Sequence, residues 1–319
     1  MLVCFMPNPR RGSVRPLFAR SRALTVAALV ASALLGVPAW TEAQAAQLFQ
    51  LDPQPVPTGP DDGVLLARPR VTATGAVGVQ VRADYGNQPL TVRLRGSASE
   101  DVRVLDHRVT GALSLSYGIV ERVSLFVTLP FVLHQETRAV LSLAAPATRG
   151  LGDLALGMNA HLFGGVDGAQ LGVGLALIEP TGSAAAFASD KRIGAVAQLR
   201  FAYAANRWSL GATTGVTLRP DREWLTHQTG ADLSLVLGAF VHPLEGLRLG
   251  LELAVATGLT DGSFLDATRT PVELDLSGRL TLDYGLYVTA AAGLGLVDGV
   301  GAPRVRATLA LGWASAARP

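Results

Sequence analysis

The chain has 319 residues, of which 49% are hydrophobic, 16% charged and 6% aromatic. Its formal net charge of +2 depends on residues 1–45, which carry five arginines and one acidic residue, Glu42. Without this region the charge becomes −2, so the composition gives no support for nucleic-acid binding. The single cysteine, Cys4, lies in the same region, which excludes disulfides and thiol chemistry from the rest of the chain.

Residues 1–45 have the pattern of a secretory signal peptide. A basic region precedes an apolar run at residues 23–40, and small residues follow in the order Ala-Gln-Ala at 43–45. The alternative is a single membrane-spanning helix, but the run is short and contains Gly36 and Pro38. We therefore expect cleavage near Ala45 and export of the remaining chain.

Residues 46–70 form a proline-rich N-terminal segment. Four prolines precede Pro69, and proline cannot donate a backbone hydrogen bond to a strand ladder. We expect a periplasmic leader that connects the signal peptide to the first strand. The alternative is a segment that folds into the interior of the following domain as a plug.

Residues 71–313 alternate between apolar and polar side chains in short segments. In residues 272–284 every second residue is apolar except Gly278, and the residues between them are polar or charged. A helix would mix these two sets, whereas a strand places them on opposite faces. This alternation predicts twelve strands, at residues 71–85, 103–119, 122–134, 151–163, 169–179, 192–205, 208–219, 229–241, 247–258, 271–284, 286–297 and 303–313.

The connections and the aromatic residues indicate where such a domain lies. The links after even-numbered strands are short and most links after odd-numbered strands are long, which is typical of outer-membrane barrels. Six aromatic residues fall near the same end of the even-numbered strands, as in an interfacial girdle: Tyr117, Phe163, Tyr203, Phe240, Tyr284 and Trp313.

We predict an all-β fold, a transmembrane up-and-down antiparallel β-barrel of about twelve strands at residues 71–313. It is expected in the cell outer membrane, with a short tail at residues 314–319.

Three stretches carry a family resemblance: RVTGALSLSYGIVERVSLFVTLPFVLHQ, GLGDLALGMNAHLFGG and LDYGLYVTAAAGLGLVDGVGAPRVRATLALGW. They resemble a broad group of Gram-negative outer-membrane barrels labelled OmpA-like, and a related group labelled for phenol-degradation pathways. The resemblance covers nearly all of residues 48–313 and implies the barrel fold without naming a substrate. Many OmpA-like proteins continue into a peptidoglycan-binding domain, whereas this sequence ends at Pro319, so peptidoglycan is not an expected partner. The stretch VRATLALGW is similar to the C-terminal signal that the barrel-assembly machinery recognises.

The sequence reveals no catalytic or metal-binding set. Its histidines lack the short spacing of paired metal ligands: His107, His134, His161, His227 and His242. The dipeptide Asp106-His107 is similar to part of an omptin-like protease site, but no positioned base accompanies it. We therefore expect no catalytic residues, no metal site, no cofactor and no enzyme activity.

Charged residues on the polar face of the predicted strands are the candidate functional residues. By alternation they would face the lumen, where charges of opposite sign should pair because isolated buried charges are costly. The candidate lumen-lining residues are Arg108, Asp153, Arg192, Arg200, Asp232, Glu252, Glu273, Asp275, Arg279, Asp283, Arg304 and Arg306.

A mixed-charge lumen leaves two main hypotheses for function. The first is a porin-like passive or selective channel for small solutes. The alternative is a structural or surface-interaction barrel with a closed lumen, and a barrel enzyme comes third. The expected partners are outer-membrane lipid, the barrel-assembly machinery and small solutes, but not nucleic acid.

Overall fold

The computed structural model describes residues 51, 56–59, 61–93, 101–137, 145–224, 227–260, 264–266, 270–297 and 301–315. The predicted signal peptide at residues 1–45 and residues 316–319 of the predicted tail at 314–319 lie outside the described residues. No helix within the described ranges is long and apolar enough to span a membrane.

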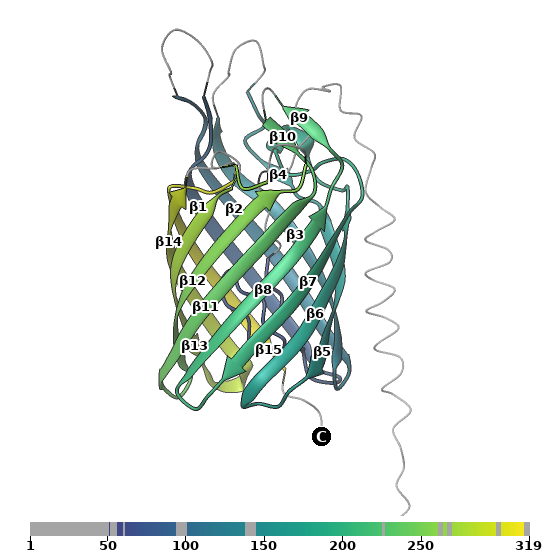
Figure 1. The fold of residues 1–319 in the computed structure, drawn as a ribbon, viewed down its shortest axis with the longest axis vertical. Coiled ribbons are helices and arrows are strands. Elements are labelled where there is room, and N and C mark those ends of the chain that lie inside the picture. The colour runs from purple at the N-terminus through teal and green to yellow at the C-terminus, as the bar shows by residue number, and fades with distance from the viewer. Residues whose placement is uncertain are drawn as a thin grey trace, which may run out of the picture. The chain divides into compact units, whose positions relative to one another are not determined.

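Twelve antiparallel strands form a closed ring in which each strand pairs with its neighbours in sequence (Figure 1). The ring closes between β1 and β15, where Gly78 lies opposite Ala314 and Asn87 lies opposite Val305. The prediction of a twelve-stranded up-and-down barrel is confirmed. The barrel strands are β1 (Val77–Arg93), β2 (Asp101–Val120), β3 (Val123–Thr137), β5 (Leu154–Phe163), β6 (Gly168–Glu179), β7 (Gly194–Ala204), β8 (Trp208–Leu218), β11 (Asp232–Leu244), β12 (Leu247–Gly258), β13 (Val272–Thr281), β14 (Leu286–Val297) and β15 (Val305–Ala314).

Long and short connections lie at opposite ends of the barrel (Figure 1). One end carries the long loops, with the short strand β4 (Gly150–Leu151) and the hairpin of β9 (Arg222–Trp224) and β10 (His227–Thr229). The other end carries only tight turns, which in outer-membrane barrels face the periplasm. We call these the long-loop end and the short-turn end.

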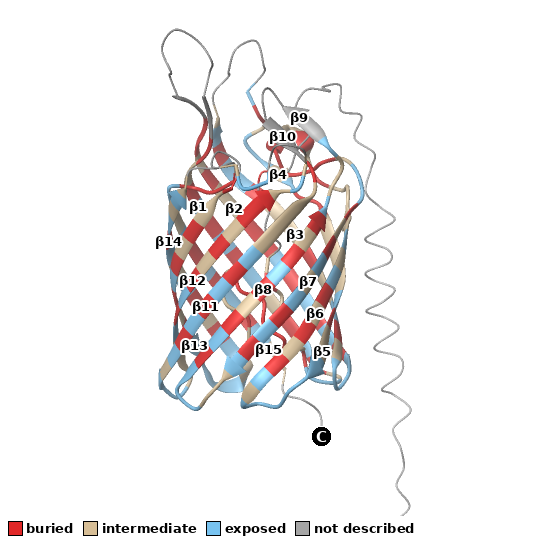
Figure 2. Ribbon diagram, viewed as in Figure 1, coloured by how far each residue is buried: buried red, intermediate tan, exposed pale blue. Residues whose placement is uncertain are grey.

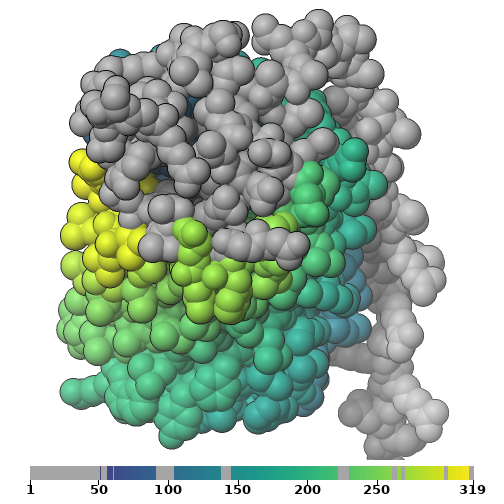
Figure 3. Space-filling view, turned by 45° about the horizontal axis from the view of Figure 1, so that its top comes forward, coloured from purple at the N-terminus to yellow at the C-terminus, as the bar shows by residue number. Residues whose placement is uncertain are grey.

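Burial alternates along the barrel strands (Figure 2). Large apolar side chains on these strands are exposed, which places them on the outside. On β2, Leu113 and Leu115 are each 38% exposed, whereas Ser114 and Ser116 are buried. Where coloured atoms are visible in Figure 3, the side chains of neighbouring strands form an outer wall without a gap. An apolar exterior around a polar interior is the reverse of a soluble barrel, and it matches a barrel whose solvent is lipid.

The aromatic residues near the short-turn end mostly face outward. The exposed ones are Tyr117, Phe163, Tyr203, Tyr284 and Trp313. Trp208 adds to this group by stacking on Tyr203, with ring centroids 5.5 Å apart. Phe240 differs from the others because its register turns it inward, where it is 3% exposed.

Several strand boundaries differ from the prediction, and two of these differences have a local reason. The first strand was expected at residue 71, but β1 starts at Val77 because the chain turns at Gly75, which has a φ of 70°. The tenth predicted strand was expected to reach residue 284. Instead β13 ends at Thr281, and the 3₁₀ turn η2 (Asp283–Gly285) follows it.

Candidate functional site

Residues 56–59 and 61–76, which we call the plug segment, run through the interior of the barrel. Leu66 is fully buried and packs against Phe240 and Ala254 of the wall. The hydroxyl of Thr213 on β8 donates a hydrogen bond to the carbonyl of Ala67 at 2.5 Å. The expectation of a periplasmic leader is therefore wrong for the plug segment, and the alternative of a lumen plug describes it.

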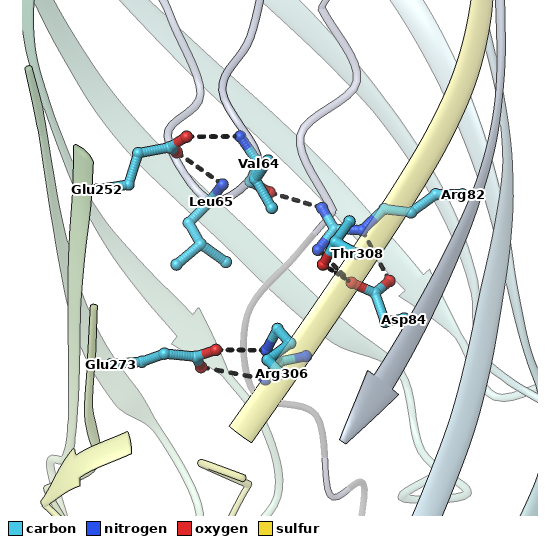
Figure 4. Close-up of polar contacts among 8 residues, drawn as sticks. All are labelled: Val64, Leu65, Arg82, Asp84, Glu252, Glu273, Arg306 and Thr308. Carbon is cyan, nitrogen blue, oxygen red and sulfur yellow. Dashed lines mark hydrogen bonds and ion pairs between the residues drawn. The ribbon is translucent and has the colours of Figure 1, made fainter. Parts of the chain in front are cut away.

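Glu252 on β12 binds the plug segment through its backbone. Its buried carboxylate accepts hydrogen bonds from the N–H groups of residues 64–66, at 2.8–3.0 Å. Figure 4 shows the two bonds to Val64 and Leu65. The hydroxyl of Ser277 donates a further bond at 2.9 Å. A Cβ atom on Gly63 would lie 2.4 Å from a carboxylate oxygen of Glu252, so glycine is what permits this close approach. Hydrogen bonds to an ionised carboxylate are among the strongest that a protein makes.

A second wall residue, Arg82 on β1, binds the same part of the plug segment (Figure 4). Its guanidinium donates to the carbonyl of Val64 at 2.5 Å and to the two carboxylate oxygens of Asp84 at 2.6 and 2.7 Å. Asp84 also accepts a hydrogen bond from the Thr308 hydroxyl at 2.6 Å. Val64 is thus held at its N–H by β12 and at its carbonyl by β1.

Further contacts fix the shape and the base of the plug segment. The carboxylate of Asp62 accepts the N–H groups of Gly59 at 2.6 Å and Arg68 at 2.7 Å, which closes a loop. Near the short-turn end, the Thr72 hydroxyl donates to Ser116 of β2 at 2.8 Å. The plug segment therefore meets the wall at several depths, mainly through polar bonds.

The loop at residues 180–193, between β6 and β7, folds inward at the long-loop end. Its 3₁₀ turn η1 (Ala184–Ala186) is followed by Phe187, which is fully buried. Arg108 of β2 donates to the carbonyls of Ala186 and Phe187, each at 3.2 Å. This loop therefore lies over part of the lumen at the long-loop end.

Asp153, between β4 and β5, also holds this loop. Its carboxylate accepts the N–H of Gly182 at 2.8 Å. Burial raises the pKa of Asp153 from 3.8 to about 6, and the negative charge of Asp190 contributes to the rise. The contact between Asp153 and the loop therefore contains a group whose pKa lies in a mildly acidic range.

Nine of the twelve candidate residues lie on the inner side, where they are buried or partly buried: Arg108, Asp153, Arg200, Asp232, Glu252, Glu273, Asp275, Arg279 and Arg306. The expected pairing of charges is seen for Glu273 and Arg306, with an N–O distance of 2.5 Å (Figure 4), and for Asp232 with Arg219. Asp275 is fully buried, and neither of its carboxylate oxygens has a hydrogen-bond partner among the described residues. In the part of the chain that the structure describes, no group of three or more His, Cys, Asp or Glu residues could hold a metal ion.

Arg192, Asp283 and Arg304 are the exceptions. Each is exposed and lies just outside a strand, before β7, after β13 and before β15 respectively. That they line the lumen stays a prediction, because strand alternation does not set the direction of a side chain outside a strand. Sequence reasoning also missed Arg82 and Asp84, although both lie on the polar face of the first predicted strand.

Two of the spaces beside the plug segment are defined by their lining residues. One is a cavity of about 170 Å³, lined by plug residues such as Val64 and Leu65 and by wall residues such as Arg82, Arg108 and Phe131. It is smaller than the roughly 300 Å³ at which small-molecule pockets begin. The other is a vestibule of about 590 Å³ at the short-turn end.

A closed up-and-down barrel with an apolar exterior and a charged, plugged interior defines an outer-membrane β-barrel, and the protein belongs to that class. In fold, the chain is similar to the crystal structure of the COG4313 outer membrane channel from Pseudomonas putida F1. The two share 17% sequence identity with a TM-score of 0.60, over 76% of this chain and 96% of that chain.

Two further solved structures show a weaker likeness, from which we draw no conclusion. The NanC porin shares 9% identity over 74% of this chain and 98% of its own, with a TM-score of 0.49. The CymD monoaromatic hydrocarbon channel shares 10% identity over 77% and 90%, with a TM-score of 0.40. No protein-family model matches the chain, and no protein of curated function matches it in sequence.

Proposed function

We propose that this protein is an outer-membrane channel for small solutes, and that movement of the plug segment opens it. The observation that carries the proposal is the set of hydrogen bonds between Glu252 and residues 64–66. These bonds hold the segment across the lumen of a barrel whose inner wall is charged. A channel built in this way conducts only when the segment gives up its wall contacts.

The contacts of the plug segment are of a kind that can break and reform. Apart from Leu66, which packs against wall residues of β11 and β12, its described contacts are mainly hydrogen bonds. Each hydrogen bond to a charged group contributes roughly 1.5–3 kcal/mol, and the exposed backbone could instead bond to water. The segment also lacks a strand ladder with the wall, except for a bridge between Thr74 and Gly118.

The occupied lumen equally favours the second candidate, a structural or surface-interaction barrel that never opens. The two candidates differ in whether solutes pass, so solute permeation separates them.

Several finer assignments are part of the same proposal. Membership of the OmpA-like group is supported by the three resembling stretches, and a secretory signal at residues 1–45 would bring the chain to the outer membrane. Lipid, the barrel-assembly machinery and small solutes are the proposed partners, while nucleic acid and peptidoglycan are not.

Swelling of proteoliposomes in solutes of increasing size tests the proposed function. We expect slow swelling for the wild type and faster swelling for Glu252→Ala, because this substitution removes the acceptor of three plug bonds. Glu121→Ala, in the exposed turn between β2 and β3, is the matched control and should behave as the wild type. If neither the wild type nor Glu252→Ala admits any solute, the barrel is structural and the channel proposal is wrong.

A further inference from the structure

The vestibule at the short-turn end has a chemistry that plug movement does not explain. It is lined by the plug segment and by the turns that join β5 to β6, β7 to β8 and β11 to β12. Five arginines and three carboxylates contribute to this lining. The vestibule is therefore positively charged overall, in a barrel whose inner wall otherwise mixes both signs.

Arg68 of the plug segment is a buried member of this group whose side chain has no polar partner among the described residues. It is 7% exposed, and its guanidinium makes no hydrogen bond or ion pair with any residue that the structure describes. Its backbone N–H bonds to Asp62, and its guanidinium carbon lies 5.6 Å from the centre of the Phe240 ring. Its nitrogens are not among the buried atoms that lack a partner, so its five N–H donors reach the solvent of the vestibule and are available to an acceptor there. This arrangement points to an acceptor that arrives from solution.

Arg248 of β12 lies beside the same ring. Its guanidinium carbon is 5.0 Å from the centre of Phe240, so two guanidinium groups contact one aromatic side chain. Arg248 donates to the carbonyls of Asp61 at 2.7 Å and Asp62 at 2.5 Å, which are neutral acceptors. The nearby carboxylate of Asp61 is bound to Arg70 at 2.9 Å.

We propose that the vestibule binds a small oxyanion, a carboxylate or phosphate group, between Arg68 and Arg248. Planar guanidinium groups bind both kinds of oxyanion through paired hydrogen bonds, and stacking on an aromatic ring orients them in advance. The volume of about 590 Å³ accommodates a small molecule that carries such a group. The site faces the end at which the plug segment joins β1.

Isothermal titration of the full chain in detergent micelles tests this site, with inorganic phosphate and succinate as separate probes. Arg68→Gln removes the charge but keeps the backbone N–H that binds Asp62, and it should weaken binding about tenfold or more. Arg122→Gln is the matched control, since Arg122 is an exposed arginine at the same end that does not line the vestibule. It should bind both probes as the wild type does.

Saturable binding of either probe that Arg68→Gln weakens and Arg122→Gln does not supports the proposal. A preference for phosphate or for succinate then distinguishes a phosphate-bearing from a carboxylate-bearing solute. Absence of saturable binding for both probes in the millimolar range overturns the proposal, as does an equal loss in the two variants. Arg68→Lys keeps the charge without the planar fork and should bind with intermediate affinity, which guards against a folding defect in Arg68→Gln. Titration does not depend on conduction, so this site and the channel proposal can fail separately.

Discussion

Glu252 and Arg82, on separate strands of the wall, bind opposite groups of the same residue, Val64. The carboxylate of Glu252 accepts the Val64 N–H at 3.0 Å, and the guanidinium of Arg82 donates to the Val64 carbonyl at 2.5 Å (Figure 4). Both bonds reach the backbone and not the side chain. The wall therefore fixes the path of the plug segment with little dependence on the side chain at residue 64.

Glu252→Gln should loosen the plug segment without breaking the barrel. The amide oxygen can replace only part of the carboxylate, and the amide N–H₂ would face backbone N–H groups that are also donors. We expect faster hydrogen exchange at residues 64–66, while exchange in β12 and β13 stays near that of the wild type. Glu245→Gln, in the exposed turn before β12, is the control and should leave residues 64–66 protected. Unchanged exchange at these residues in Glu252→Gln would show that the carboxylate does not hold the segment.

Arg82→Met should lower the stability of the folded barrel. The substitution leaves the buried carboxylate of Asp84 with only the hydroxyl of Thr308 as a hydrogen-bond donor among its present partners. Breaking a buried ion pair by removing one partner costs about 3–5 kcal/mol in the free energy of unfolding. Urea unfolding in micelles measures this difference.

The double variant Arg82→Met/Asp84→Leu provides the control for that experiment, because it removes the unpaired charge as well. It should recover much of the lost free energy of unfolding. A double variant as unstable as Arg82→Met alone would mean that the lost free energy of unfolding comes from packing. It would not then come from the Asp84 carboxylate that has lost its partner.

Gly118→Ala should detach the base of the plug segment from β2. A Cβ atom on Gly118 would clash with the Ala73 carbonyl oxygen, so residues 72–74 would have to move. We expect faster hydrogen exchange at residues 72–76. Gly278→Ala is a matched control, since its added Cβ would meet only a side-chain atom of Leu249 at 3.5 Å, an ordinary contact. Equal exchange in both variants at residues 72–76 would contradict the close approach of these residues to β2.

The loop at residues 180–193 should be more stable at mildly acidic pH than at neutral pH. The pKa of Asp153 rises from 3.8 to about 6 in the folded state, so this state binds the proton more tightly than an opened loop does. The contribution of this group to loop stability is therefore greatest below 3.8, falls as the pH rises to about 6, and is level above that.

Hydrogen exchange of the loop at about pH 5 and about pH 7.5, corrected for the intrinsic rates, checks this direction. Asp153→Asn is neutral at both values, and its amide oxygen can still accept the Gly182 N–H. It should remove the pH dependence, whereas Asp167→Asn, in an exposed turn at the other end, should keep it. Greater protection of the wild-type loop at the higher pH would contradict the raised pKa.

The strands could be predicted from sequence because their signal is local. Side chains of a strand alternate between two faces, and a barrel in lipid separates apolar from polar residues at every position. The same rule placed Glu252 and Glu273 inside. It does not apply to Arg192, Asp283 and Arg304, which lie outside the strands, where alternation carries no information about the direction of a side chain.

The path of the plug segment could not be predicted because its determinants are far apart in sequence. Residues 64–66 offer backbone N–H groups, which every residue but proline has, and Glu252 supplies the acceptor from the middle of another predicted strand. The prolines indicated only that the segment is neither helix nor strand. The unpaired character of Arg68 depends on the same long-range arrangement and has no sequence signal.

Single-channel recording in planar bilayers tests the central claim most directly, by comparing the wild type with Glu252→Ala under the same salt and voltage. We predict that the wild type stays mostly closed and that Glu252→Ala opens more often or to larger unitary currents, while Glu121→Ala matches the wild type. Identical currents in the wild type and Glu252→Ala would contradict the claim that the hydrogen bonds of Glu252 hold the plug segment across the conducting path.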